Sequence, residues 1–371
     1  MIPLVDLQAA NSEVAGEIET GFKRIIEESA FIGGAEVAAF EREYAALHGV
    51  AHCVGVANGT DALELALRAA GVGPGDEVVL PANTFIATAE AVARIGAKVV
   101  LVDMDPASFL IDVDAAAAAV TPATRAIVPV HLYGQLAPVE ALRAQLAGAD
   151  VAIVEDAAQC QGATRFGRAA GVDGIAATSF YPGKNLGAFG DAGAVVTDDE
   201  SQATMVRTIG NHGGLKKYVH DVIGVNSRLD GLQAVALRAK LARLDGWNKQ
   251  RRDAAARYHE LLADLEVVRP VTVDGNEHVW HLYVIRVPSG DGTSARRDAV
   301  LAKLNAAGVG ASIHYPVPVH LTGAFAAGQP GAGAFPHTEA AAHEILSLPI
   351  YPQITPDQQT FVASALAAAL R

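Results

Sequence analysis

The chain has 371 residues, of which 51% are hydrophobic and 19% charged, so it encodes a packed globular protein and not a disordered one. The formal net charge of −13 argues against nucleic-acid binding, which would need a basic face. The two cysteines, Cys53 and Cys160, are too few for a disulfide framework, which favours a reducing compartment. With no signal-peptide pattern and no long apolar run, we expect a cytoplasmic protein without a membrane partner.

The chain begins with two predicted helices. Apolar residues at three- and four-residue spacing predict an amphipathic helix over residues 11–28. A glycine pair interrupts it, and a second helix over residues 35–48 ends at Gly49, as glycine commonly ends a helix.

From residue 51 onward, short apolar strands alternate with helices. Strands this uniformly apolar indicate an α/β protein whose mostly parallel sheet is covered by helices on both faces. The pattern leaves the order of the strands open. The predicted strands are 51–56, 77–80, 98–103, 126–132, 151–155, 174–180 and 193–197, and the helices are 62–70, 84–95, 113–120, 139–146 and 199–210.

The C-terminal third differs in pattern. Residues 229–265 look helical, with a boundary near residues 245–247, and strand-like runs then mix with helices. We therefore predict a large domain over residues 1–247 and a smaller α+β domain over residues 248–371. Its predicted elements are strands 279–287 and 309–315, helices 295–306, 338–346 and 356–370, and a surface loop over 323–336.

A carboxylate and a lysine follow two of the predicted strands. Asp156 ends one strand, and Lys184 follows the next strand in a turn flanked by glycines. We interpret Lys184 as a Schiff-base lysine and Asp156 as the partner of a pyridinium nitrogen, a pair that points to pyridoxal phosphate. The alternatives are a solvated loop lysine and an aspartate that caps a helix.

A phosphate-binding turn is predicted where Gly59 and Thr60 lie between a strand and a helix, with Ser179 as a further hydroxyl. Phe85 is placed to stack on a planar ring, and Gln159 to reach the phenolic oxygen of the cofactor. Each has a simpler reading: a capped turn, a polar strand residue, a core aromatic and a surface glutamine.

Other motifs fail on context. The glycines at 71–75 follow a helix and precede a strand, the reverse of a dinucleotide-binding loop. His278 and His281 have no further ligands near them in sequence, so we predict no metal site.

Taken together, these motifs resemble the DegT/StrS family of pyridoxal phosphate-dependent sugar aminotransferases. The resemblance covers nearly the whole chain and implies an aspartate aminotransferase-like fold (fold type I), with a large domain and a smaller C-terminal α+β domain. It is carried by residues 58–63 (NGTDAL), 81–85 (PANTF), 155–159 (EDAAQ), 179–187 (SFYPGKNLG) and 224–230 (GVNSRLD).

The resemblance implies a role for each cofactor residue. Lys184 binds the cofactor and moves the proton, and Asp156 pairs with the pyridinium. Asn226 reaches the phosphate from a neighbouring subunit, so we expect a homodimer with active sites at its interface. The remaining implied contacts are Gln159 at the phenolic oxygen, Phe85 on the ring face, and Gly59, Thr60 and Ser179 at the phosphate.

Residues 181–188 and 224–228 most resemble those of enzymes that act on dTDP-linked 3-keto-6-deoxyhexoses. The resemblance implies that L-glutamate donates an amino group, giving a dTDP-3-amino-3,6-dideoxyhexose. Enzymes that aminate carbon 4 more often carry His-Pro-x-Lys and Thr-Thr-Gly-Glu-Gly, which this chain lacks, and the dehydratase branch has histidine in place of Lys184. The alternatives are a 4-keto or cyclitol aminotransferase and a cofactor-binding regulatory protein without turnover.

Two groups of residues are predicted to contact the substrate. Tyr181, His314 and Tyr315 are expected to line the sugar site, although the last two would also suit packing of the small domain. A polar loop is expected to meet the nucleotide diphosphate, with a solvated loop as the alternative. Its residues are His212, Lys216, Lys217 and Tyr218.

Overall fold

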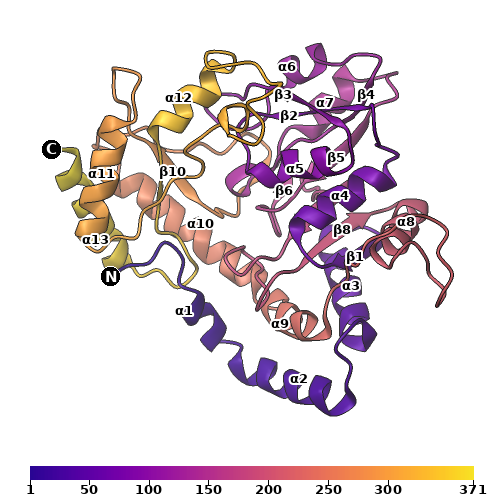
Figure 1. Ribbon diagram of the computed structural model, residues 1–371. Coiled ribbons are helices and arrows are strands. Elements are labelled where there is room, and N and C mark those ends of the chain that lie inside the picture. The colour runs from indigo at the N-terminus through magenta and orange to yellow at the C-terminus, as the bar shows by residue number, and fades with distance from the viewer.

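The protein is described by a computed structural model that covers all 371 residues (Figure 1). Its centre is a seven-stranded sheet with strand order β1-β8-β7-β5-β4-β2-β3. Strand β8 is antiparallel to both neighbours, and every other neighbouring pair is parallel, which confirms the predicted mostly parallel sheet. The strands are β1 (His52–Val56), β2 (Glu77–Pro81), β3 (Lys98–Val102), β4 (Thr124–Ile127), β5 (Ala152–Asp156), β7 (Ile175–Ser179) and β8 (Gly193–Thr197).

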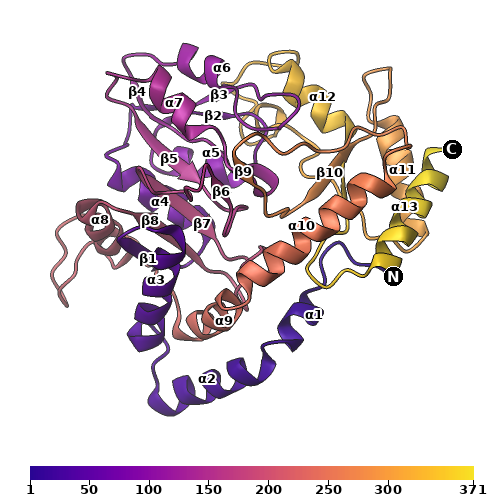
Figure 2. The same cartoon turned by 180° about the vertical axis from the view of Figure 1, so that it is seen from behind.

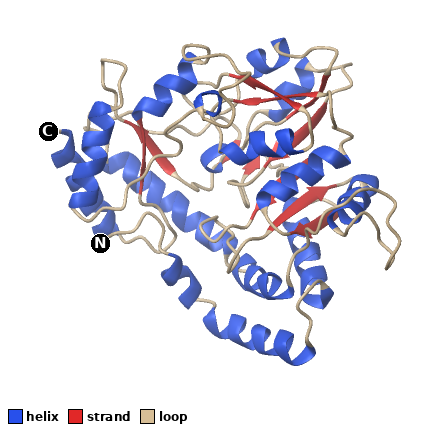
Figure 3. Ribbon diagram, viewed as in Figure 1, coloured by secondary structure: helices blue, strands red, loops and turns tan.

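Helices cover both faces of this sheet (Figure 3). Alternate residues along each strand enter different cores, because side chains of a strand point to opposite faces in turn. Val78 and Leu80 belong to one buried cluster, and Val79 between them belongs to another. Helices α4 (Gly59–Ala69), α5 (Ile86–Arg94) and α8 (Glu200–Gly210) pack on the first face, and α3 (Gly34–His48), α6 (Val113–Ala118), α7 (Val139–Gln145) and α9 (Gly231–Leu241) on the second.

The N-terminal segment departs from the single predicted helix over 11–28. Two helices occupy it, α1 (Leu7–Ser12) and α2 (Ala15–Glu28). The first begins earlier because the Asp6 side chain accepts a hydrogen bond from the backbone N–H of Ala9 at 3.0 Å. Both helices lie outside the sheet layers, along the side of the molecule that carries α9 (Figure 2).

The C-terminal part contains a small antiparallel pair, β10 (Tyr283–Arg286) with β11 (Ile345–Leu348). Helices α10 (Leu244–Leu261), α11 (Ala295–Ala306) and α13 (Pro356–Leu370) supply most of its apolar core. Ile2 joins that core, and its backbone N–H bonds the carbonyl of Gly308 at 2.8 Å. The start of the chain therefore packs against the C-terminal part, and both termini lie on the same side of the molecule (Figures 1 and 2). Short elements complete the fold: η1 (Leu132–Gly134), β6 (Thr164–Arg165), β9 (Asn276–Glu277) and η2 (Val319–Leu321).

Two expectations for this part were wrong. Residues 309–315 form only isolated bridges, to Ile2 and to Ser347, instead of a strand. The predicted helix over 338–346 stops early, as α12 (Pro336–Glu344), and the next four residues form β11 because β10 offers them a pairing edge. The break between α9 and α10 falls at residues 242–243. The division into domains at residues 247/248 stays a prediction.

No helix of this structure has both the length and the apolar character that crossing a bilayer requires.

Phe40 lies in the core between α3 and the sheet and is 0% exposed. Its ring packs edge-to-face on Phe180, which follows β7, with centroids 5.3 Å apart. Because Phe40→Ala leaves a cavity beneath that strand, we expect the free energy of unfolding in urea to fall by about 3–5 kcal/mol. Phe361→Ala, at a phenylalanine that is 49% exposed, is the control and should change it by less than about 1 kcal/mol. Equal losses in the two variants would contradict the assignment of Phe40 to the core.

Candidate active site

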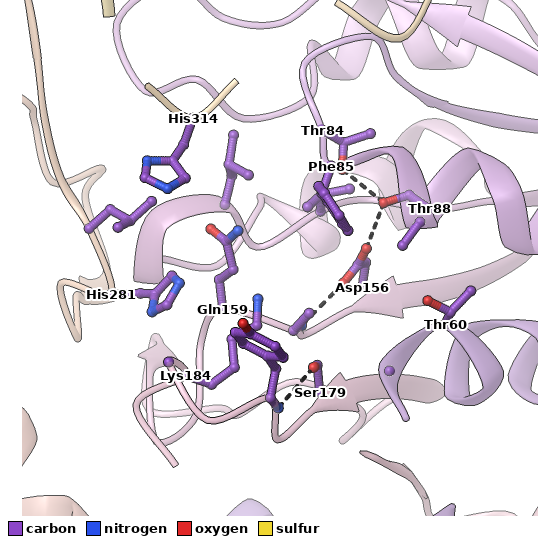
Figure 4. Close-up of a pocket in the computed structure, with 18 of the residues that line it drawn as sticks. Thr60, Thr84, Phe85, Thr88, Asp156, Gln159, Ser179, Lys184, His281 and His314 are labelled. Atoms are coloured by element: carbon purple, nitrogen blue, oxygen red, sulfur yellow. Dashed lines mark hydrogen bonds between the residues drawn. The ribbon is translucent and has the colours of Figure 1, made fainter. Parts of the chain in front are cut away.

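A cavity of about 560 Å³ opens where the parallel strands of the sheet end. Loops that follow β1, β2, β4, β5 and β7 form its walls, as is usual for ligand sites of open α/β sheets (Figure 4). Two segments of the C-terminal part and the N-terminal Leu4 and Val5 complete it. The lining residues from the C-terminal part are His281, Leu282, His314 and Tyr315.

Lys184 lines this cavity from a turn that is fixed on several sides. The backbone N–H of Lys184 bonds the carbonyl of Tyr181 at 2.8 Å, which closes the turn. Gly187 must lack a side chain, since a Cβ there would lie 2.3 Å from the carbonyl oxygen of Pro182. Lys240 Nζ donates to the Gly187 carbonyl at 2.7 Å, and Asn185 Nδ2 donates to the Val279 carbonyl at 2.9 Å. The lysine is therefore presented from a rigid support.

The electrostatic surroundings of Lys184 suit a reactive amine. Burial lowers the pKa of Lys184 to about 8, while the nearby Asp156 carboxylate acts in the opposite direction. A substantial fraction of the amine is neutral near this pH, and the neutral form is the nucleophile.

Asp156 ends β5 with its side chain buried. Its Oδ2 accepts a hydrogen bond from Thr88 Oγ1 at 2.8 Å, and its Oδ1 accepts one from the backbone N–H of Ala158 at 3.1 Å. Burial raises the pKa of Asp156 above its ordinary value, against the effect of these donors and of Lys184. No helix follows the strand, so the helix-cap alternative for Asp156 is excluded.

Gln159 is buried, which excludes its reading as a surface glutamine. Its Oε1 accepts from the backbone N–H of Tyr133 at 2.7 Å, and its Nε2 donates to the Tyr315 hydroxyl at 3.1 Å. Phe85 is 51% exposed, so it is not a core aromatic. Its ring lies 5.3 Å from that of Tyr315, and both side chains line the cavity.

The start of α4 provides a group of hydrogen-bond donors. Asn58 caps the helix by accepting from the N–H of Asp61 at 2.8 Å, and the N–H groups of Gly59 and Thr60 bond no acceptor within the chain. A Cβ at Gly59 would lie 2.5 Å from the Cβ of Ser179, so glycine is required for this approach. Thr60 and Ser179 line the cavity beside it. Free N–H groups and hydroxyls at a helix N-terminus suit a phosphate.

The structure separates the predicted substrate residues into two groups. Tyr181, His314 and Tyr315 line the cavity. Burial lowers the pKa of His314 to about 4, and its Nδ1 lies 2.8 Å from Ser347 Oγ. The second group is exposed, lies on the loop after α8 and does not line this cavity. It comprises His212, Lys216, Lys217 and Tyr218, and Asn226, which was predicted to reach the cofactor phosphate, is exposed on the same loop and also does not line this cavity.

Sequence reasoning missed Thr84, Thr88, His281 and Asp191, which also line the cavity. Thr88 bonds Asp156 across 68 positions of sequence, and no local pattern indicates such a contact. Burial lowers the pKa of His281 well below its ordinary value, so this imidazole is neutral.

The donor set fits pyridoxal phosphate. The cavity holds an amine of lowered pKa, a buried carboxylate without a cationic hydrogen-bond partner and an exposed aromatic face. It also holds free N–H and hydroxyl groups that can donate hydrogen bonds to a phosphate. The cofactor offers a matching aldehyde, pyridine nitrogen, flat ring and phosphate.

The pKa of Lys184 can be measured by acetylating the cofactor-free protein at a series of pH values. We expect half-maximal labelling of Lys184 near pH 8, by mass spectrometry of its peptide. In Asp156→Asn the midpoint should fall, because the lost carboxylate stabilises the ammonium. Lys240, whose pKa burial also lowers to about 8, is the internal control and should keep its midpoint. An unchanged Lys184 midpoint in the variant would contradict the Asp156–Lys184 interaction.

Comparison with known proteins gives extensive matches. The DegT/DnrJ/EryC1/StrS aminotransferase family matches residues 13–367. The pleiotropic regulatory protein of Geobacillus stearothermophilus is 44% identical, over 99% of this chain and 98% of its own length. The dTDP-3-amino-3,4,6-trideoxy-alpha-D-glucose transaminase of Streptomyces venezuelae is 44% identical, over 98% of this chain and 95% of its own. The crystal structure of S. venezuelae DesV with a ketimine intermediate matches at TM-score 0.96 and 43% identity, covering 100% of this chain and 99% of that one.

These matches confirm the predicted resemblance and the aspartate aminotransferase-like α/β fold. They also confirm pyridoxal phosphate as the cofactor and transamination as the reaction class. The chain therefore belongs to the DegT/DnrJ/EryC1/StrS aminotransferase family.

Proposed function

We propose that this protein transfers an amino group from L-glutamate to the keto carbon of a dTDP-3-keto-6-deoxyhexose. The product is a dTDP-3-amino-3,6-dideoxyhexose for deoxyaminosugar biosynthesis. The observation that carries the proposal is the Lys184 amine of lowered pKa near the buried Asp156 carboxylate. Both lie in a cavity that also contains the hydrogen-bond donors at the start of α4. The 44% identity to a dTDP-3-amino sugar transaminase supports the substrate class.

In this proposal the residues of the cavity hold the cofactor by complementary chemistry. Asp156 would hold the pyridine nitrogen, and the ring, when bound, supplies the electron sink for breaking a C–H bond. Phe85 would stack on the ring, and Gln159 would approach the phenolic oxygen. Gly59, Thr60 and Ser179 would hold the phosphate at the start of α4.

Lys184 moves the proton. A pKa of about 8 lets its Nζ both accept and donate a proton near neutral pH, which suits a general acid/base. The turn holds the backbone of Lys184 at the wall of the cavity, so the same amine is available to both the amino donor and the keto sugar.

The sugar is proposed to bind between Tyr181, His314 and Tyr315. His314 is neutral, because burial lowers its pKa to about 4, so it recognises hydroxyl groups by hydrogen bonds and not by charge. Lys216, Lys217 and Tyr218 lie on an exposed loop that could supply cations to a nucleotide diphosphate.

A homodimer is proposed to complete the site. Asn226 lies on the loop after α8 and does not line the cavity of its own chain. That loop exposes several large apolar side chains, which is typical of a protein interface. They are Leu215, Tyr218, Val219, Val222 and Ile223.

A product assay tests the substrate. The purified protein should bind pyridoxal phosphate and turn yellow, and L-glutamate should remove the visible band. Incubation with a panel of dTDP-ketosugars should then give a 3-amino product, located by NMR. Amination at carbon 4 or of a cyclitol ketone would support those alternatives. Absence of all turnover would favour a regulatory protein, the designation of one relative.

Lys184→Ala should lower kcat at least about 100-fold, since it removes the general acid/base. The control is Lys249→Ala, at an exposed lysine outside the cavity, which should leave kcat unchanged. Normal turnover by Lys184→Ala would contradict the mechanism.

Subunit mixing tests the dimer. Lys184→Ala and Asn226→Ala should each be impaired as pure proteins. If Asn226 serves the partner's site, a mixed dimer has one site with both residues intact, so activity should return after the two variants are exchanged. No recovery, with subunit exchange verified by mass spectrometry, would contradict the intersubunit role of Asn226.

A further inference from the structure

Two buried threonine hydroxyls connect the start of α5 to the carboxylate of Asp156 (Figure 4). Thr84 lies just before α5, and Thr88 is the third residue of this helix. Thr84 is 4% exposed and Thr88 is 1% exposed. Thr84 Oγ1 lies 2.8 Å from Thr88 Oγ1, and Thr88 Oγ1 donates to Asp156 Oδ2 at 2.8 Å.

The direction of these hydrogen bonds follows from the ionisation of Asp156. A carboxylate only accepts hydrogen bonds, so Thr88 must give its single hydroxyl proton to Oδ2. The Thr88 oxygen is then left to accept, and Thr84 must donate to it. This arrangement stabilises the ionised form of Asp156, because a hydrogen bond to the charged form favours that form.

The contact with Thr88 also orients the carboxylate. Asp156 Oδ1 is held by the backbone N–H of Ala158, and Oδ2 by the Thr88 hydroxyl, so each oxygen has one donor. Two donors on opposite oxygens fix the rotation of the carboxylate plane. Thr84, Thr88 and Asp156 all line the cavity, so this series of hydrogen bonds lies in the wall of the site.

We propose that Thr88, supported by Thr84, is a positioning residue that keeps Asp156 ionised and oriented toward the pyridine nitrogen of bound pyridoxal phosphate. The inference rests on the cofactor site described under the proposed function, but not on the identity of the sugar. Burial already raises the pKa of Asp156, and the Thr88 donor opposes that effect. Without the hydroxyl, Asp156 takes up a proton at a higher pH and holds the pyridinium less well.

The structure offers a closely matched control. Thr338 is the third residue of α12, is 1% exposed, and donates through Oγ1 to Asp103 Oδ1 at 2.7 Å. Neither Thr338 nor Asp103 lines the cavity. Thr338→Val therefore removes the same kind of hydrogen bond, at the same helix position, away from the cofactor.

The test compares Thr88→Val, Thr88→Ser and Thr338→Val as full-length proteins. Each is freed of cofactor and titrated with pyridoxal phosphate, with binding followed by visible absorbance from pH 5 to 9. For Thr88→Val we expect the dissociation constant to rise about 10- to 100-fold, the effect of losing a hydrogen bond to a charged group. Thr88→Ser keeps the hydroxyl and should restore binding, and Thr338→Val should bind as the wild type does.

The pH dependence gives a readout that a purely structural role would not produce. Because loss of the donor raises the pKa of Asp156, the acid limb of cofactor binding should move to higher pH in Thr88→Val alone. The substitution leaves the other titratable groups that act on Asp156 in place. These are Lys184, His131, Cys160 and Tyr315.

Equal cofactor affinity and an equal acid limb in Thr88→Val and Thr338→Val would overturn the proposal. If Thr88→Val does not fold, Thr84→Val replaces it, since it removes only the donor to Thr88 and should shift both readouts in the same direction by a smaller amount. Unchanged cofactor affinity and an unchanged acid limb in a folded Thr84→Val would then overturn the proposed role of the Thr84–Thr88–Asp156 hydrogen bonds. A wild-type protein that binds the cofactor but aminates no sugar would refute the proposed function and leave this inference standing.

Discussion

The removal of two opposite charges from water is the constraint on which this site depends. Burial lowers the pKa of Lys184 to about 8 and raises that of Asp156, so each group resists its charged form, while their mutual attraction favours it. The balance leaves an amine that can change protonation near neutral pH and a carboxylate that gains from a cation. In the proposed function, a protonated pyridine nitrogen would supply that cation. Desolvation of the two charged groups is therefore unfavourable in the cofactor-free protein, and the same desolvation favours binding of the cofactor.

The pleat of β5 gives two adjacent acids different functions. Glu155 and Asp156 follow each other in sequence, so their side chains point to opposite faces of the sheet. Asp156 faces the cavity. Glu155 instead accepts from the Gly171 N–H at 3.0 Å and pairs with His131 Nε2 at 2.8 Å, both buried. His131 Nδ1 accepts a hydrogen bond from the Ala137 N–H at 3.0 Å, so the ring hydrogen is on Nε2, which donates a hydrogen bond to Glu155. Only Asp156 is available to a ligand.

The turn that carries Lys184 also links the two parts of the chain. Asn185 Nδ2 donates to Asn248 Oδ1 at 3.0 Å, and its Oδ1 lies 3.2 Å from His281 Nδ1. These partners lie on α10 and just before β10, and the nearby His281 and His314 line the cavity. The position of the amine relative to the proposed sugar residues is thus set by buried polar contacts, which hold geometry more strictly than apolar packing does.

Local sequence determined most of the fold and the chemical identity of the site. The alternation of apolar strands with helices predicted the parallel sheet, and α11 and α13 end within one residue of the predicted bounds, because period and capping act over a few residues. Lys184 and Asp156 were identifiable because each follows an apolar strand. Tertiary structure alone decided what depends on strand order and distant pairing. It made residues 345–348 a strand by placing β10 beside them, and it brought Thr88 to Asp156 across two strand positions of the sheet. Such contacts join residues far apart in the chain, so no local pattern encodes them.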